Sequence, residues 1–230
     1  MREGDVFGFN YNENITKADA WAQLQYSLSK FQVFAAVEGG NTQMWRTGLM
    51  QSGRFPDNSL GESDKVNFTT YTVKGGLTWK MNGRNYLYVN GLYGTRAPLF
   101  RNTFVSPRTR DFVVPNIEAS TIQSVEGGYL LRSPKFRGRL TAYMTDFKNE
   151  TENIFASAWS VGRVLGELDL GSLGFGSDDN SLEQPIFFGA TILQGVNRRH
   201  AGVEAALEAK PLPSWVFTAA ANLGKYIYTN

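Results

Sequence analysis

The sequence predicts an all-β, antiparallel fold, and three observations support this prediction. Apolar and polar side chains alternate with period two over runs roughly twice as long as the five or six residues usual for a strand. Very short connections between these runs alternate with long ones. The 230-residue chain has 24 glycines, 13% aromatic residues and only 8 prolines, a composition that favours strands and tight turns.

The alternation is clearest over residues 69–80, where Tyr71, Leu77 and Trp79 fall on one face and Lys74 falls on the other. With a first strand expected around Val6 to Tyr11, the whole chain is predicted to have about nine strands. The other segments with this pattern are 22–28, 31–37, 85–95, 124–131, 136–148, 201–209 and 215–223.

The connections alternate strictly between two kinds. Short turns are expected near Ser29, Asn82, Pro134 and Pro211, and Asn82-Gly83 is expected to supply the positive-φ pair of a tight hairpin. Long segments rich in Gly, Ser, Asn, Asp and Arg cover 47–65, 98–117 and 150–195. Short turns on one rim and long loops on the other are typical of outer-membrane barrels, in which the turns are periplasmic and the loops extracellular.

The distribution of charge favours a transmembrane barrel over a soluble β-sandwich, which stays the alternative because its strands also alternate. A Lys or Arg on the lipid face costs about 2–4 kcal/mol at the membrane midplane, whereas a charge in the lumen costs little. Asp146 is the exception in the apolar phase, and it lies near the loop end of its strand. The charges predicted to face the lumen are Lys74, Arg96, Glu126, Arg137, Arg139 and Glu204.

The predicted fold class is therefore an antiparallel transmembrane β-barrel with short periplasmic turns and long extracellular loops. No stretch approaches the ~18 apolar residues of a membrane-spanning helix, and the mean hydropathy is −0.30. A barrel strand shows lipid only every second side chain, so this low value is compatible with a membrane protein. Trp79 and Trp215, beside short turns, are expected to belong to an aromatic girdle.

The composition excludes most catalytic and metal chemistry. The chain has no cysteine and one histidine, His200, which removes disulfides, thiolate nucleophiles and His-rich metal centres. No nucleophile-elbow, P-loop or paired-histidine motif occurs, so no catalytic residue, metal or cofactor is predicted, and His200 is expected to make a lumen hydrogen bond. A net charge of +2 makes a nucleic-acid partner unexpected.

Three segments, 93–100, 140–150 and 197–207, resemble the barrel of TonB-dependent outer-membrane receptors. The first reads Tyr-Gly-Thr-Arg-Ala-Pro-Leu-Phe, the second contains Tyr-Met-Thr-Asp-Phe-Lys, and the third contains Gly-Val-Glu, in the order of that family. The resemblance implies that residues 1–230 are a partial barrel domain, from the later part of a barrel of about 22 strands, without its plug domain. A Bacteroidetes-type member is one candidate.

The resemblance also implies a function and partners. The chain is expected in the bacterial outer membrane, in contact with its lipid, where it imports a siderophore, cobalamin or glycan. Energy would come from the TonB complex through the plug, and a surface lipoprotein is a further candidate partner. A passive porin-like or structural barrel, or a soluble β-rich binding module, stays open as an alternative.

The long loops supply the candidate ligand contacts. Basic and aromatic residues in the 98–117 segment suit an anionic or ring-shaped ligand, although contact with lipopolysaccharide or simple solubility would explain them equally well. A tryptophan in the 150–195 segment could stack on a sugar or heterocycle face, or could equally cap a cluster of loop residues. The residues predicted to contact ligand are Arg101, Phe104, Arg108, Arg110 and Trp159.

Overall fold

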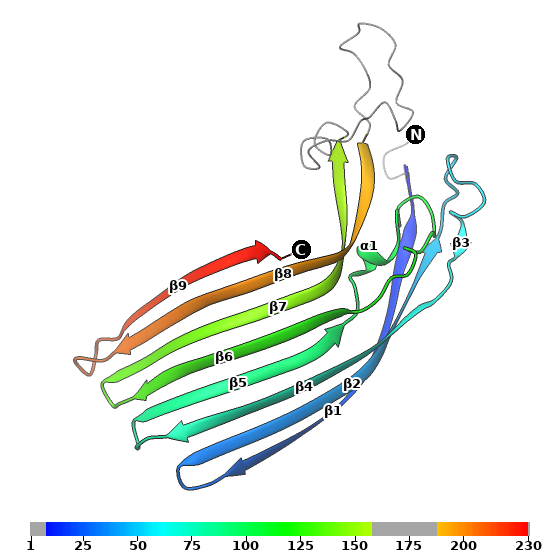
Figure 1. The fold of residues 1–230 in the computed structure, drawn as a ribbon. Coiled ribbons are helices and arrows are strands. Elements are labelled where there is room, and N and C mark those ends of the chain that lie inside the picture. The colour runs from blue at the N-terminus through cyan, green and yellow to red at the C-terminus, as the bar shows by residue number, and fades with distance from the viewer. Residues whose placement is uncertain (1–7, 158–187, 230) are drawn as a thin grey trace, which may run out of the picture.

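The strands of the protein form one long antiparallel sheet (Figure 1). The computed structural model describes residues 8–157 and 188–229. The elements are β1 (Tyr11–Ser27), β2 (Phe31–Gly48), β3 (Gly61–Glu62), β4 (Val66–Lys80), β5 (Asn85–Arg96), α1 (Phe100–Thr103), β6 (Ser120–Arg132), β7 (Phe136–Ser157), β8 (Phe188–Ala209) and β9 (Phe217–Tyr228).

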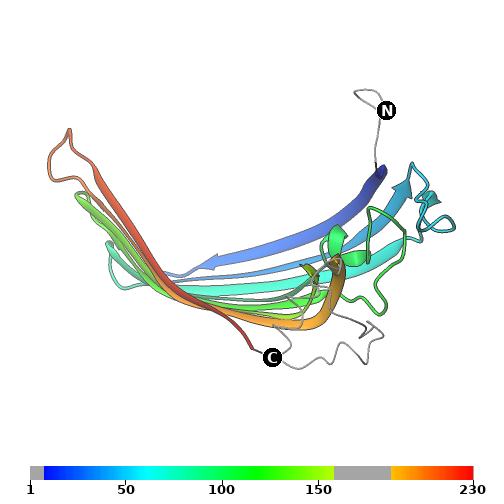
Figure 2. The same cartoon turned by 90° about the horizontal axis from the view of Figure 1, so that it is seen from above.

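Each long strand pairs with the next long strand in the sequence, in the order β1-β2-β4-β5-β6-β7-β8-β9, and the short β3 pairs with β2. The all-β antiparallel prediction is confirmed, and the described residues contain the predicted number of nine strands. The ninth strand is β3, however, and not a strand around Val6 to Tyr11, because Tyr11 begins β1, which continues without a break to Ser27. The sheet curves but does not close, so β1 and β9 are its edges (Figure 2).

The turn at Asn82-Gly83 has its predicted position but not its predicted conformation. Neither residue has a positive φ. Instead, the side-chain oxygen of Asn82 accepts hydrogen bonds from the backbone N–H groups of Arg84 (2.9 Å) and Asn85 (3.0 Å). The side chain therefore closes a longer connection that needs no left-handed residue.

The register of the sheet puts the apolar phases of its strands on one side, the apolar face. The large side chains in one row across this face are 39–80% exposed, because nothing in the described part of the chain covers them. A sheet face of this kind suits contact with hydrocarbon. The row consists of Tyr26, Val33, Leu77, Val89, Gly127, Ala142, Val203 and Leu223.

The opposite side, the polar face, contains three aromatic side chains that each lie across a glycine on the next strand. A Cβ atom added to any of these glycines would lie within 3.0 Å of the neighbouring ring or its hydroxyl. Close approach therefore requires glycine at these positions. The pairs are Phe34 with Gly76, Tyr88 with Gly128, and Tyr143 with Gly202.

Aromatic side chains lie at both ends of the apolar face. Trp79 is exposed beside a short turn and stacks on Phe31, with 6.4 Å between the ring centroids, and Trp215 is also exposed beside its turn. Towards the loops, Tyr71 packs on Tyr93 at 6.1 Å. The strand rises ~26 Å between Tyr71 and Trp79, or ~20 Å along the membrane normal at a tilt of ~40°. This approaches the ~25 Å height of the lipid-facing band of a barrel.

Asp146, the unexpected charge in the apolar phase, has a partner directly opposite it on β8. Arg199 donates through two of its nitrogens to the two carboxylate oxygens, at 2.7 and 2.8 Å. Both residues share a cross-strand row with Tyr93, at the level of the aromatic side chains nearest the loops. Two-pronged pairing at headgroup level explains why the apolar face tolerates this carboxylate.

The β7/β8 pair bends sharply where its register shifts. Asn149 has φ 56° and Gly195 has φ 76°, a conformation that these two residue types adopt most readily. Beyond the bend, the two strands rise steeply away from their neighbours (Figure 1). The long loop predicted to begin at Glu150 is thus partly strand, because β7 continues to Ser157 and β8 begins at Phe188.

The buried apolar core lies at the loop end of the polar face. Met44 of β2 and Phe68 of β4 pack with Phe100 and Phe104 from the connection between β5 and β6. The rings of Phe100 and Phe104 are 4.9 Å apart. This core fixes the connection across the end of the sheet. Within the residues described, no helix has the length and apolar character needed to cross a membrane.

Candidate functional site

A cluster of opposite charges lies at the loop end of the polar face, where β7 bends. Glu150 is 5% exposed and pairs with arginines from two other strands. Arg96 of β5 donates to Oε1 at 2.9 Å, and Nε of Arg198 of β8 donates to Oε2 at 2.7 Å. Arg198 also lies 3.0 Å from Glu152. One buried carboxylate therefore links β5, β7 and β8 at the base of the loops.

A pocket of about 260 Å³ opens beside this charge cluster. Its walls come from the end of β5, from α1 and from the part of β7 beyond the bend. Charged groups, amides and apolar side chains all contribute, which suits a small polar solute or one part of a larger solute. The lining includes Arg96, Leu99, Arg101, Asn102, Asn153 and Arg198.

Two asparagine side chains in the pocket wall have fixed orientations. Nδ2 of Asn102 donates to the carbonyl oxygen of Thr151 at 2.7 Å, and Nδ2 of Asn153 donates to that of Arg101 at 3.3 Å. Each side-chain oxygen is therefore left as an acceptor, and neither has a partner in the part of the chain that the structure describes. A buried acceptor without a partner costs about 1–3 kcal/mol, so a hydrogen-bond donor would be favourable here.

Arg46 connects the two long connections, 49–65 and 97–119, into one platform. Its side chain is 1% exposed, and it donates to the carbonyl oxygens of Pro107 (2.6 Å) and Ser59 (2.8 Å). Burial lowers the pKa of Arg46 from its usual value. Arginine remains charged in spite of such a shift, so each hydrogen bond has an ionised donor and is correspondingly strong.

The predicted ligand residues do not form a single cluster. Phe104 is completely buried in the apolar core, so it contributes packing and has no surface for a ligand. Arg101 is exposed and lines the pocket. Trp159 lies outside the described residues.

The other two predicted loop residues, Arg108 and Arg110, lie against aromatic rings and away from the pocket. The guanidinium of Arg108 is 5.2 Å from the ring centroid of Phe9, and that of Arg110 is 4.8 Å from that of Phe55. Cation–π contacts of this kind hold the connections together. Any ligand contact by Arg108 or Arg110 would therefore be separate from contact with Arg101.

The six charges predicted to face the lumen all lie on the polar face, and several have hydrogen-bonded partners. Glu126 accepts from Asn90 at 2.8 Å, and Glu204 accepts from Asn222 at 3.0 Å. That this face borders the lumen of a closed barrel stays a prediction. The residues that share the face are Lys74, Arg96, Glu126, Arg137, Arg139 and Glu204.

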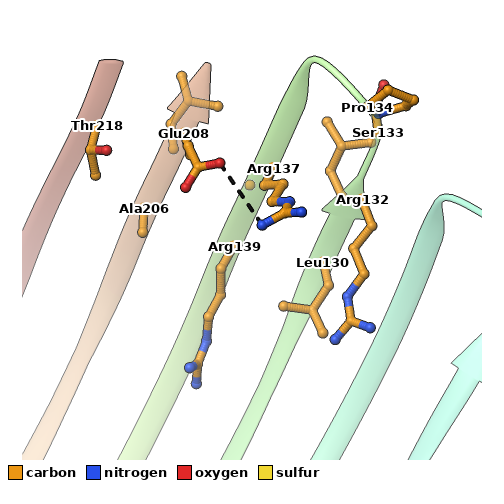
Figure 3. Close-up of a pocket in the computed structure, with 12 residues that line it drawn as sticks. Leu130, Arg132, Ser133, Pro134, Arg137, Arg139, Ala206, Glu208 and Thr218 are labelled. Carbon is orange, nitrogen blue, oxygen red and sulfur yellow. Dashed lines mark ion pairs between the residues drawn. The ribbon is translucent and has the colours of Figure 1, made fainter. Parts of the chain in front are cut away.

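A second feature of the polar face lies at its turn end, remote from the pocket. Arg132, Arg137 and Arg139 extend from the same side of β6 and β7 into a shallow groove (Figure 3). The groove has a volume of about 810 Å³. Glu208 of β8 lies 3.9 Å from Arg137.

Sequence reasoning missed Glu150, Arg198, Asn102 and Asn153 as site residues. The proximity of Glu150 to Arg198 could have been approached by counting along both strands from the cross-strand pair of Phe136 and Ala209, but the register shift breaks that count. The two asparagines carry no signal in the sequence, because only the folding of α1 onto β7 brings them together.

His200 packs against the rings of Phe147 (5.0 Å) and Tyr226 (4.7 Å), so its clearest contacts are aromatic. Within the described ranges, no group of three or more His, Cys, Asp or Glu side chains could hold a metal ion.

The fold and the site together define a class of protein. Long tilted strands with one uncovered apolar face and one charged face, joined by short turns at one end and a folded loop platform at the other, form the wall of an outer-membrane barrel. A family model described as "TonB dependent receptor-like, beta-barrel" matches residues 3–230. The chain therefore belongs to the TonB-dependent receptor β-barrel family, a family of outer-membrane receptors and transporters.

Solved structures share this fold. The copper transporter OprC has a TM-score of 0.61 at 11% identity, over 93% of this chain and 29% of that chain. The ferric-catecholate import receptor Fiu from Escherichia coli K12 has a TM-score of 0.63 at 13% identity, over 97% of this chain and 29% of that chain. This chain thus spans less than a third of either structure. No curated protein matches it.

Proposed function

We propose that the chain is part of the wall of an outer-membrane receptor that imports a small solute in a TonB-dependent manner. The observation that carries the proposal is the pocket at the loop end of the polar face, with its charge cluster and two free amide acceptors. A solute arriving from outside meets the loop platform first, and the pocket lies at its base. Membership of the receptor family supports the same direction of transport.

The pocket favours a solute that both donates and accepts hydrogen bonds. Arg101 supplies donors and the oxygens of Asn102 and Asn153 supply acceptors, a combination that hydroxyl or amide groups can satisfy. A siderophore, a cobalamin and a glycan all contain such groups. Energy from the TonB complex through a plug domain, and help from a surface lipoprotein, remain parts of the proposal that rest on the family alone.

Blocking the pocket in the complete protein tests this proposal. Leu99 is 61% exposed and lines the pocket, so Leu99→Trp fills space there without overpacking the core. Leu60 is 58% exposed in the other long connection, and Leu60→Trp is the matched control. Uptake of a labelled ferric siderophore, cobalamin or oligosaccharide is measured in cells that produce each variant.

The expected result is an uptake of one probe that falls at least about fivefold with Leu99→Trp, stays normal with Leu60→Trp, and disappears without TonB. Equal amounts of each variant in the outer membrane are required. Normal uptake by Leu99→Trp would remove the pocket from the pathway, and uptake that persists without TonB would point to a passive barrel.

A further inference from the structure

We propose that basic residues at the turn end of the sheet bind anionic phospholipids of the inner leaflet of the outer membrane. The proposal does not depend on which solute is imported, because these residues lie at the opposite end of the strands from the pocket. Three observations carry it: basic residues paired between neighbouring turns, a shortage of carboxylates to balance them, and aromatic side chains of the apolar face beside them.

Basic residues meet wherever one hairpin lies beside the next at the turn end (Figure 1). At each of the three contacts, a backbone hydrogen bond joins two basic residues, with N···O distances of 2.7, 2.7 and 2.8 Å. Each contact therefore brings two like charges side by side, which is destabilising and becomes favourable when an anion lies between them. These turn-end pairs are Lys30 with Lys80, Arg84 with Arg132, and Lys135 with Lys210.

The described residues supply little negative charge to the turn-end pairs. The short turns, 28–30, 81–84, 133–135 and 210–216, contain no Asp or Glu. Lys210 has a carboxylate partner in Glu208, at 3.2 Å, and the guanidinium of Arg132 lies 5.2 Å from the ring centroid of Tyr86. One exposed member of each pair has no ion-pair partner in the part of the chain that the structure describes. These exposed turn cations are Lys30, Arg84 and Lys135.

Each exposed turn cation directly precedes a strand that begins with a residue of the apolar face, beside an aromatic ring. Phe31 stacks on Trp79, with 6.4 Å between the ring centroids, and Phe136 is exposed. The hydroxyl of Tyr129 donates to Asn85. Aromatic rings of this kind lie at the headgroup level of a membrane, so the cations lie about one residue, or ~3.3 Å, further towards the periplasm. The consecutive residues are Lys30-Phe31, Arg84-Asn85 and Lys135-Phe136.

A phospholipid with a negatively charged headgroup fits both surfaces at once. Its headgroup would lie against the exposed turn cations, and its acyl chains would lie on the apolar face beyond the aromatic rings. A small anion or an acidic polypeptide would use the charges and leave the apolar surface beside them unused. The contacts between hairpins recur every second strand, ~10 Å apart, so each can hold a separate headgroup. Short turns of outer-membrane barrels are periplasmic, so the leaflet is the inner one.

Lipid retention by the complete protein tests the proposal. The protein is reconstituted in vesicles of phosphatidylethanolamine with phosphatidylglycerol as the minor component, and is then extracted in mild detergent. Native mass spectrometry identifies and counts the lipids that remain bound. The turn variant has three substitutions to Gln, at Lys30, Arg84 and Lys135. The matched control has three substitutions to Gln at exposed basic residues of the loop end, Arg54, Lys65 and Lys148.

The unmodified protein should retain phosphatidylglycerol well above its share of the vesicle lipid. The turn variant should retain at least about fivefold less, because each basic residue at an anionic lipid surface contributes about that factor. The control should retain as much as the unmodified protein. Equal retention of the two lipids by the unmodified protein, or a phosphatidylglycerol content that the turn variant leaves unchanged, would overturn the proposal.

A second measurement needs no variant and so does not depend on how well the turn variant folds. Phosphatidylglycerol with a photoactivatable headgroup is added to vesicles that contain the unmodified protein, and the labelled peptides are sequenced. The proposal expects label on residues 28–31, 81–85 and 133–136, displaced by unlabelled phosphatidylglycerol and not by phosphatidylethanolamine. Label confined to the loop end, or displaced equally by both lipids, would contradict it.

Discussion

Removal of the Glu150 carboxylate should release the loop platform from β7. Asn102 of α1 hydrogen-bonds to the carbonyl of Thr151, the residue directly after Glu150. The ion pairs of Glu150 with Arg96 and Arg198 hold this part of β7 against β5 and β8. Glu150→Ala therefore loosens the anchor of α1 without touching the apolar core.

The free energy lost in Glu150→Ala depends on how far each partner of the ion pairs is buried. Breaking a fully buried ion pair costs about 3–5 kcal/mol, and an exposed pair is worth about 0–1 kcal/mol. The Glu150 side chain is 6% exposed, but those of Arg96 and Arg198 are 55% and 33% exposed and recover part of their hydration. An intermediate loss of about 2 kcal/mol is expected, which corresponds to about 30-fold in an opening equilibrium.

Amide hydrogen exchange in the complete protein measures this opening. The N–H groups of Val105 and Val114 are hydrogen-bonded within the β5–β6 connection, at 2.9 Å each, and report on its local unfolding. Their exchange should be about 30-fold faster in Glu150→Ala. Glu208→Ala, which removes a carboxylate at the turn end, is the control and should leave them unchanged. If both variants protect these two N–H groups from exchange equally, the apolar core alone holds the loop platform.

Three further predictions concern the sheet and its core. Gly128→Val should prevent assembly or strongly lower the yield of folded barrel, because the new side chain collides with the ring of Tyr88. The yield is measured by heat-modifiable gel mobility, and Gly128→Ala should lower it less. Asp146→Ala should destabilise the folded barrel by about 1–2 kcal/mol in urea titrations in lipid vesicles, because Arg199 is left unpaired on the apolar face, and the double variant with Arg199→Ala should recover most of that loss. Met44→Ala should cost about 2–3 kcal/mol and speed exchange in the β5–β6 connection, since a cavity opens below Phe104; no change in exchange would argue against a shared core.

The strand pattern was predictable because alternation and register depend on the same period of two. Tyr71, Leu77 and Trp79 lie on the apolar face as predicted, and the charged residues of the same strands lie on the other. The first strand was misplaced because 11–21 contains polar residues in both phases, such as Asn12 and Lys17, and gives little alternation. Pairing with β2 along its whole length compensates for that weak local pattern.

The candidate site was much less predictable, because its residues meet only through the loops. Composition marked Phe104 as a ligand residue, but composition cannot distinguish an exposed ring from one that fills a core. Glu150 appeared to begin a loop, whereas the bend at Asn149 and Gly195 keeps it within a strand and turns it towards Arg96. Charge partners of this kind depend on three strands at once, so no single segment contains the signal.

The bend in β7 and β8 also affects which part of the protein is exposed outside the cell. A strand of the membrane wall needs only about 9–11 residues to cross the bilayer, whereas β7 has 22. The remaining residues of β7, at its loop end, extend at an angle to the bilayer and reach up to about 30–40 Å beyond it. Peptide tags placed in this part of β7 should therefore be readily detected on intact cells.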